Sequence, residues 1–275
     1  MATTTIDGLH VRDSGERDLD AILCLHSLFL DGSMFDGLAA AAAGRFRVVV
    51  PDFRGQGASA PAATDEITME QCTDDVETVL DALGLDAFHV VAQSMGGDVA
   101  VRLAARRPAA IRSLVLLGSS ARAEPPEQLA EFEPVADAVA VQGFSGELLE
   151  TIMAIMFGAT TREDPARATD VARWREQIAA LPRELAPAVR GVIRRSSAVE
   201  LLPSIAAPAL VVSGTEDIAR PPAWADEVVA GLPHAELWRL EGIGHSPTLE
   251  APDRVIPRVL DFVETAGATA PPARA

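Results

Sequence analysis

The 275-residue sequence predicts an α/β protein, built on a mostly parallel, doubly wound sheet with a helical segment inserted between two of its strands. Two observations lead to this prediction. Short apolar runs alternate with amphipathic segments along most of the chain, which is the pattern of βαβ units. Between residues 120 and 200 the alternation stops, and only helical patterns follow until it resumes at 208.

Six apolar runs are the predicted strands. Most are continuously apolar, which suits strands that are buried on both faces of a parallel sheet. The runs cover residues 21–27, 46–52, 88–94, 111–119, 208–217 and 235–245. The helices predicted between them, from apolar residues at helical spacing, cover residues 69–84, 95–108 and 221–233.

These patterns divide the chain into a core and an insertion. Residues 1–119 and 201–265 are expected to form the α/β core, and residues 120–200 a helical cap, or lid, inserted into it. The last residues, 266–275, are mainly small residues and prolines, so we expect a disordered tail there.

The composition argues against several partners and chemistries. The formal net charge is −17, so the surface should repel phosphate backbones and anionic lipids, and neither nucleic acid nor a membrane is an expected partner. All 23 basic residues are arginine, which excludes lysine Schiff-base chemistry and a P-loop lysine. The cysteines, Cys24 and Cys72, belong to no Cys/His cluster, so we expect buried, reduced thiols and no metal site.

The N-terminal residues lack the basic and apolar regions of a signal peptide, and the apolar stretch 21–30 is too short to span a bilayer. A soluble, cytoplasmic protein is therefore expected. The sequence leaves the oligomeric state open between a monomer and a homodimer.

Ser94 stands where a predicted strand meets a predicted helix. The segment reads Ala92-Gln93-Ser94-Met95-Gly96, close to the G-x-S-x-G pattern of a nucleophile elbow. Residues two positions before and after the serine must be small, because the strand and helix backbones nearly touch there. The helix that begins at Met95 also directs its unpaired N–H groups and positive dipole end at the serine. The alternative is a serine N-cap followed by packing glycines.

A serine nucleophile needs a general base that is itself held by a third group. His245 lies in a glycine-flanked loop after the last predicted strand, where open α/β sheets build their sites. Asp217 follows the preceding strand and is the expected acid, with Glu216 beside it as the alternative. The backbone N–H groups of Leu28 and Met95 are the expected oxyanion donors.

Five segments resemble the α/β-hydrolase superfamily, over roughly residues 6–265. In chain order they read LHSLFLDGSMF, VVVPDFRGQGAS, VVAQSMGG, LVVSGTED and GIGHSPTLEAP. The order Ser94, Asp217, His245 is the order of that family's catalytic triad. The resemblance implies the α/β-hydrolase fold, and within the family the segments are most similar to 3-oxoadipate enol-lactonases and small carboxylesterases.

The resemblance also implies structural roles for several residues of these motifs. The family usually has His-Gly where this chain has His26-Ser27, but a backbone N–H donor at Leu28 does not require glycine. His26 is expected to hold that loop in place. Asp52 and Arg54 are expected to stabilise their own turn rather than to act in catalysis.

The implied activity is hydrolysis of a carboxylic ester or lactone of a small, largely apolar molecule through an acyl-enzyme. Serine at the elbow argues against dehalogenases and epoxide hydrolases, which use aspartate, and against dienelactone hydrolases, which use cysteine. Thioester hydrolysis, acyl transfer, carbon–carbon bond hydrolysis and cofactor-free perhydrolysis remain open, and a non-catalytic small-molecule receptor is the alternative outside enzymes. No nicotinamide, flavin or metal motif is present, so no cofactor is expected.

The cap is expected to line the substrate site. Most of its apolar residues should only pack the insertion onto the core, because that is the usual role of apolar residues at helical spacing. A substrate that carries a carboxylate would need one of the cap arginines turned inward. The residues expected to contact substrate are Phe29, Met156, Phe157 and Trp174.

Overall fold

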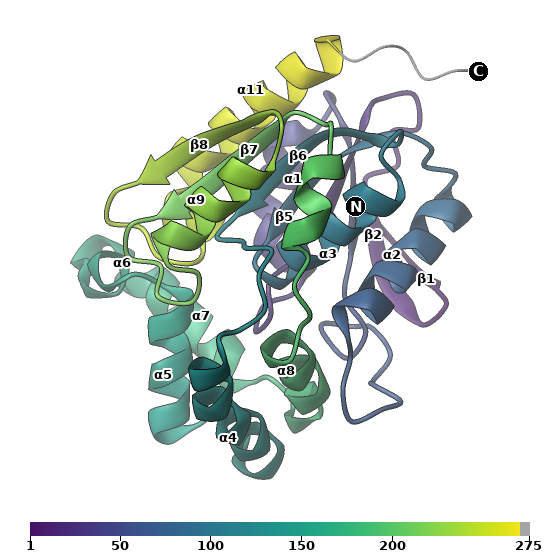
Figure 1. The fold of residues 1–275 in the computed structure, drawn as a ribbon. Helices are drawn as coiled ribbons and strands as arrows, with labels where there is room; N and C mark the ends of the chain where they lie inside the picture. The colour runs from purple at the N-terminus through teal and green to yellow at the C-terminus, as the bar shows by residue number, and fades with distance from the viewer. Residues whose placement is uncertain (270–275) are drawn as a thin grey trace.

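The computed structural model describes residues 1–269. A single eight-stranded sheet has the strand order β1-β2-β4-β3-β5-β6-β7-β8, with helices packed on both of its faces (Figure 1). Strands β3 to β8 pair with one another in parallel. The pairs β1–β2 and β2–β4 are antiparallel. The predicted fold class, a mostly parallel and doubly wound α/β sheet, is confirmed.

All six predicted runs contain a strand. The strands β3 to β7 are buried along their whole length or nearly so, which explains why continuous apolar runs mark them. The strands are β1 (Ala2–Ile6), β2 (Leu9–Asp13), β3 (Ala21–Leu25), β4 (Arg47–Pro51), β5 (Phe88–Gln93), β6 (Ile111–Leu117), β7 (Ala209–Gly214) and β8 (Ala235–Leu240).

The hairpin of β1 and β2 has no such apolar signal. The strand β1 is almost wholly exposed and rich in threonine, so an apolar pattern does not reveal it. Its turn residues, Asp7 and Gly8, have φ values of +47° and +80°. A two-residue hairpin turn of the mirror-image type requires positive φ at both positions, and Asp-Gly is one of its preferred pairs.

The core helices form one layer on each face of the sheet. Helix α1 (Asp36–Ala42) packs against α11 (Pro252–Thr269) on one face. On the other face, α2 (Met69–Leu83) packs against α3 (Met95–Arg106), and η4 (Val199–Ser204) joins α3 to α9 (Pro222–Gly231). The short elements η1 (Gly32–Phe35) and α10 (Pro247–Glu250) lie in loops beside the site described below.

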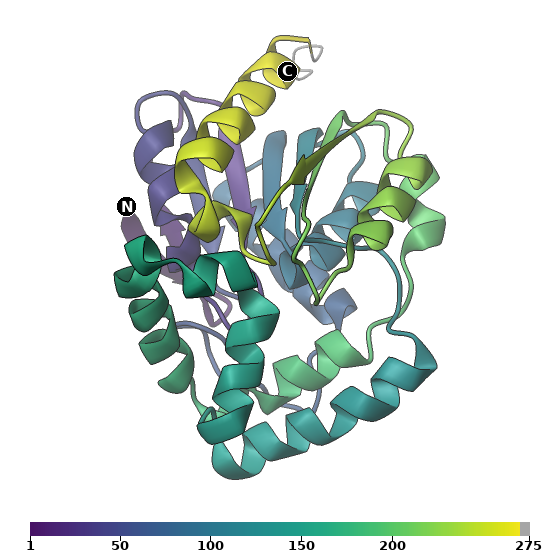
Figure 2. The ribbon, with the colours of Figure 1, turned by 90° about the vertical axis from the view of Figure 1, so that its left-hand side faces the viewer.

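The segment of residues 120–200, which we call the cap, lies between β6 and β7 and contains no strand. Figures 1 and 2 show its teal and green helices gathered together beside one end of the sheet. Its elements are α4 (Pro126–Gln142), α5 (Gly146–Met156), α6 (Ala159–Glu163), η2 (Pro165–Arg167), α7 (Ala168–Ala179), η3 (Arg183–Leu185) and α8 (Ala186–Ile193).

Helix α11 extends beyond residue 265, where the core was expected to end. Its apolar stripe continues from Val259 and Val263 to Ala266, all of them buried, so the helix has core contacts along this length. The rest of the expected tail, residues 270–275, lies outside the described residues. None of the helices in residues 1–269 is long and apolar enough to cross a lipid bilayer.

His89, in β5, is a buried titratable group in the sheet. Its Nδ1 atom lies 2.8 Å from Ser113 Oγ on the neighbouring strand, and its ring lies edge-on to that of Phe46. Burial lowers the pKa of His89 from 6.5 to about 4, and the folded protein therefore holds this imidazole in its neutral form near neutral pH.

We predict that His89 makes the protein less stable in mild acid. Between pH 6.5 and 4 the unfolded chain binds a proton that folded His89 does not, so the free energy of unfolding falls as the pH falls, by about 3 kcal/mol at most. His89→Gln retains a polar side chain beside Ser113 but does not titrate. Urea unfolding at several pH values should therefore show a flatter pH dependence for this variant, with His26, whose pKa burial also lowers, accounting for part of the remaining slope. An unchanged dependence would contradict the assignment.

Candidate active site

Ser94 occupies the sharp turn between β5 and α3. Its backbone angles, φ +52° and ψ −113°, belong to a region that residues with a side chain rarely adopt. The turn is held by its own amide, which donates to Leu117 O at 3.0 Å, and by its carbonyl, which accepts from the Gly97 and Asp98 N–H groups. The strand on one side and the helix on the other therefore keep the serine in this strained conformation.

The residues around the serine are small because two backbones meet there. A Cβ atom at Gly96 would overlap the carbonyl oxygen of Leu25, at the end of the neighbouring strand β3. A Cβ atom at Gly97 would overlap Ser119. Ala92, which stands where the motif has its first glycine, is fully buried in β5 and fits without disturbing the strand.

His245 and Asp217 form a buried pair. The Nδ1 atom of His245 lies 3.0 and 2.9 Å from the two carboxylate oxygens of Asp217, and the two residues are only 2% and 3% exposed. They come from the loops that follow β8 and β7. When Nδ1 donates to a carboxylate, Nε2 is left to accept a proton, as a general base requires. Gly118 lies under the pair, where a Cβ atom would be 3.2 Å from the imidazole Nδ1.

Two features place this pair beside Ser94. Gly118 directly follows the residue that accepts the hydrogen bond of the Ser94 amide. The side chain of Gln93 donates to Ser246 Oγ at 3.3 Å, which joins the residue before the serine to the residue after His245. Among the hydrogen bonds of residues 1–269, none connects the Ser94 hydroxyl to His245. In unliganded enzymes such bonds are often long and tighten only when substrate binds.

Glu216, the alternative acid, turns toward the cap instead. Its carboxylate accepts hydrogen bonds from the hydroxyl and the backbone N–H of Thr160, at 2.5 and 2.8 Å. These bonds hold the pKa of Glu216 below its usual value. Of the two neighbouring carboxylates, it is therefore Asp217 that the structure brings to His245.

Glu250 is a buried carboxylate of the site that the sequence motifs did not single out. It ties the backbone on both sides of His245 to the cap, and it is only 3% exposed. The sequence signal that could have found Glu250 was an acidic residue in the segment that carries the candidate base, His245. Its two oxygens accept hydrogen bonds, at 2.8 to 3.0 Å, from the N–H groups of Gly158, Gly244 and Ser246 and from the hydroxyl of Thr161.

The two expected oxyanion donors have unpaired N–H groups. In the part of the chain that the structure describes, neither the Leu28 nor the Met95 amide donates a hydrogen bond within the protein. Met95 is the first residue of α3, so its N–H is one of the donors that a helix leaves unpaired at its N-terminus. Leu28 lies in the loop after β3, where the next residue, Phe29, has a φ of +65° and turns the chain.

His26 holds the loop of Leu28. Its Nδ1 atom donates to the carbonyl oxygen of Ser27 at 2.8 Å, and its Nε2 atom accepts from the Phe53 N–H at 2.9 Å. Burial lowers the pKa of His26, although Asp52 nearby opposes this effect, and a neutral ring matches this bonding pattern. These contacts give His26 a structural place rather than a catalytic one.

Asp52 and Arg54 also form hydrogen bonds and ion pairs with residues of neighbouring segments. Burial by itself would raise the pKa of Asp52, but hydrogen bonds from the backbone amides of Ala58 and Gly32 lower it below its usual value. The guanidinium of Arg54 binds the carboxylate of Asp75 at 2.5 and 2.9 Å. Cys24 and Cys72 are free and buried, and burial raises the pKa of both thiols.

A cavity of about 370 Å³ lies between the cap helix α7 and the core loops around η1 and α10. Phe29 and Trp174, two of the expected substrate residues, are in its wall. The other two, Met156 and Phe157, are not in the wall, and Phe157 instead stacks on Trp174 with 4.4 Å between ring centroids. The cavity thus reaches the loop of Leu28 at Phe29, but Ser94 is not among its lining residues.

Two cap arginines also line this cavity, and both are already bonded. Arg167 donates to the carbonyl oxygen of Leu249 at 2.7 Å, while Arg173 lies 3.0 Å from the carboxylate of Asp170. The cavity wall is therefore mixed, with aromatic side chains and paired charges. Among residues 1–269, no group of three or more His, Cys, Asp or Glu side chains is placed to hold a metal ion.

Comparison with known proteins identifies the family. Residues 20–252 match a family described as the alpha/beta hydrolase fold, and the chain belongs to this family, as its motifs indicated. A solved structure of a thermophilic esterase from Thermogutta terrifontis is similar, with a TM-score of 0.87 and 26% identity, over 97% of this chain and 100% of that one. The enol-lactonase from Burkholderia xenovorans LB400 has a TM-score of 0.86 and 29% identity, over 96% and 100% of the two chains.

Among curated relatives, polyketide synthase ThaQ from Burkholderia thailandensis is 30% identical over 253 residues, or 88% of this chain. The chain spans only 12% of the length of that protein. The match therefore concerns one segment of a much larger polypeptide.

Proposed function

We propose that this protein is a serine hydrolase that cleaves a carboxylic ester or lactone of a small, largely apolar molecule. The observation that carries the proposal is the buried His245–Asp217 pair beside the strained turn of Ser94. Family membership and the likeness to an esterase and an enol-lactonase support an enzyme that hydrolyses ester bonds. No cofactor is needed for this chemistry.

In the first half of the reaction, His245 takes the proton of the Ser94 hydroxyl as Oγ attacks the carbonyl carbon. Asp217 holds the imidazole in the required tautomer and stabilises the imidazolium that forms. The negative charge that develops on the carbonyl oxygen accepts hydrogen bonds from the N–H groups of Leu28 and Met95, and the N-terminus of α3 adds its dipole.

The first half ends when His245 gives its proton to the leaving alcohol, which breaks the carbon–oxygen bond of the substrate and leaves the acyl group on Ser94. In the second half, His245 takes a proton from water as the water attacks the acyl carbon. It then gives this proton to Ser94 Oγ as the bond between the acyl carbon and Oγ breaks and the acid is released. A lactone follows the same steps, except that the leaving alcohol stays attached to the acyl group until a hydroxy acid is released.

The expectation of an apolar portion in the substrate rests on two aromatic residues. Phe29 and Trp174 lie in the wall of the cavity that reaches the loop of Leu28, and aromatic side chains in a pocket wall favour apolar groups through burial. The cap arginines in the wall are paired, so we assign no carboxylate to the substrate.

A fluorophosphonate probe and a panel of p-nitrophenyl esters and lactones test the proposal. The wild-type protein should be labelled and should hydrolyse members of the panel, whereas Ser94→Ala should do neither. Ser119→Ala, which removes another buried hydroxyl near the elbow, is the control and should retain labelling. A folded wild-type protein that is not labelled would indicate a receptor, and product formation that requires peroxide or an alcohol acceptor would indicate perhydrolysis or acyl transfer.

The two neighbouring carboxylates should respond very differently to amide substitution. Asp217→Asn should lower kcat by about 10³- to 10⁴-fold, because the amide NH2 can donate a hydrogen bond to Nδ1 and so favours the wrong tautomer of His245. Glu216→Gln is the matched control and should leave kcat close to the wild-type value, because its side chain bonds to Thr160. Steady-state kinetics with one active ester measures both. The reverse pattern would show that Glu216 is the acid.

A further inference from the structure

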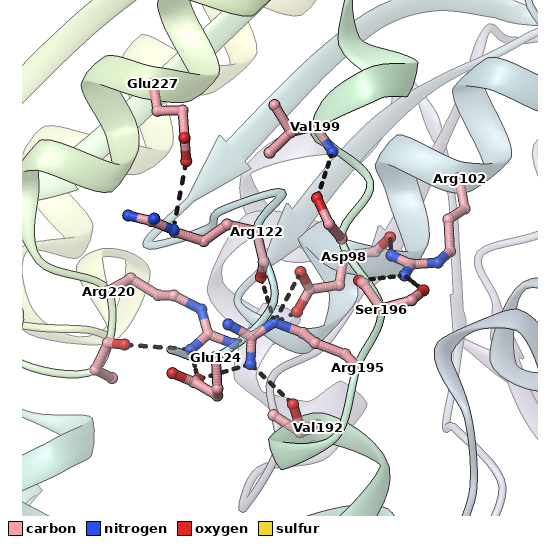
Figure 3. Close-up of polar contacts among 12 residues, drawn as sticks. Asp98, Arg102, Arg122, Glu124, Val192, Arg195, Ser196, Val199, Arg220 and Glu227 are labelled. Atoms are coloured by element: carbon pink, nitrogen blue, oxygen red, sulfur yellow. Dashed lines mark hydrogen bonds and ion pairs between the residues drawn. The ribbon is translucent and has the colours of Figure 1, made fainter. Parts of the chain in front are cut away.

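Four buried charged side chains, Asp98, Glu124, Arg195 and Arg220, meet near the loop of Asp217, and we call them the charge quartet (Figure 3). Their side chains are between 0% and 6% exposed. One Glu124 oxygen lies 2.7 Å from Arg195 Nη1 and 3.1 Å from Arg220 Nη1. The two Asp98 oxygens lie 3.5 Å from Arg195 and 3.4 Å from Arg220. The quartet therefore holds two positive and two negative groups.

Each member comes from a different segment of the chain. Asp98 is in the first turn of α3, and its N–H donates to Ser94 O. Glu124 lies in the connection that enters the cap after β6, and Arg195 in the connection that leaves it after α8. Arg220 lies in the loop after β7, together with Asp217. The quartet thus joins the nucleophile helix, the acid loop and both ends of the cap.

Arg220 contacts Asp217 directly. Its backbone N–H donates to Asp217 Oδ1 at 2.8 Å, and the same oxygen lies 3.0 Å from His245 Nδ1. The guanidinium of the same residue is anchored between two carboxylates. The anchored side chain therefore fixes where the backbone N–H can be, and the N–H in turn fixes one oxygen of the catalytic acid.

Burial of the four charged side chains of the quartet is unfavourable for folding, and a role in positioning Asp217 explains why they are nevertheless buried. Burial and the neighbouring Arg195 lower the pKa of Arg220, whereas the carboxylates of Asp98, Glu124 and Asp217 raise it, so the charged form depends on those partners. Within residues 1–269 each member also has one polar side-chain atom without a hydrogen bond. Apolar side chains often replace buried ion pairs without loss of stability, so stability by itself does not explain a partly satisfied network beside the acid.

We propose that Arg220 is a positioning residue, which Asp98 and Glu124 hold so that it fixes the Asp217 carboxylate toward His245. Arg195 extends the constraint to the two ends of the cap. The proposal rests on the proposed function, because it assigns Arg220 a role relative to the catalytic pair.

Arg220→Met, which keeps an apolar side chain but loses the charge, is the first test. Its kcat for an active ester should fall by about 10- to 100-fold, because a small misplacement of the acid misorients the base, while KM should stay within about threefold. The far-downfield proton resonance of the His245–Asp217 hydrogen bond should be lost or displaced. Arg220→Lys, which retains the charge but not the forked geometry, should show a smaller loss of kcat.

Two further variants separate positioning from stability. Arg47→Met breaks an ion pair away from the site, in which the buried Arg47 of β4 binds the half-buried Asp13 of the hairpin strand β2 at 2.6 and 3.0 Å. It should lower Tm but keep kcat and the resonance. The double variant Arg220→Met/Glu124→Gln removes one charge of each sign, so it should regain Tm relative to Arg220→Met without regaining kcat. If Arg220→Met does not fold, kcat and the proton resonance are measured in the double variant instead.

The outcomes distinguish the two proposals. A folded Arg220→Met, or the double variant, with wild-type kcat and an unchanged resonance would overturn the role of Arg220. A wild-type turnover that Ser94→Ala does not reduce would overturn the proposed function instead. In that case, loss of the resonance in Arg220→Met would still support Arg220 as the residue that holds Asp217.

Discussion

The backbone conformation of Ser94 is the constraint on which the rest of the site depends. A residue with φ of +52° stays in that conformation only because β5 is paired on both sides and α3 begins at the next residue. Gly96 lets the start of α3 touch the end of β3 at Leu25. The same contact brings the loop of Leu28 to the serine, so a single close approach serves both the turn and the expected oxyanion donors.

Buried carboxylates connect this rigid turn to the loops and the cap. Glu250 bonds the backbone on both sides of His245 to the cap residues Gly158 and Thr161. The charge quartet joins the loop of Asp217 to α3 and to both ends of the cap. Since a buried charge that loses its partner is strongly destabilising, these contacts should hold the loops far more firmly than surface ion pairs would. The cap is thus tied to the core beside the loops of both Asp217 and His245.

The sequence patterns predicted the features that depend on residues close together in the chain. They missed features that depend on contacts between distant segments. The six core strands follow from apolar runs, and the loops of Asp217 and His245 from their place after strands. The β1–β2 hairpin was missed because β1 is exposed, although the Asp-Gly turn was a usable signal. Glu250 and Arg220 resemble surface residues in the sequence, because part of what buries them lies far away in the chain, such as Thr161 for Glu250 and Asp98 for Arg220. Helical spacing also could not separate Trp174, in the cavity wall, from Phe157, which packs behind it.

The covalent intermediate tests the central claim most directly. Acid quenching of the protein during turnover of a p-nitrophenyl ester, followed by mass spectrometry of the intact chain and its peptides, detects any acyl group that the protein carries. The account predicts a mass gain equal to the acyl group, located on the peptide that contains Ser94 and absent from Ser94→Ala. An acyl group on another residue, or steady turnover in the Ser94→Ala variant, would contradict it.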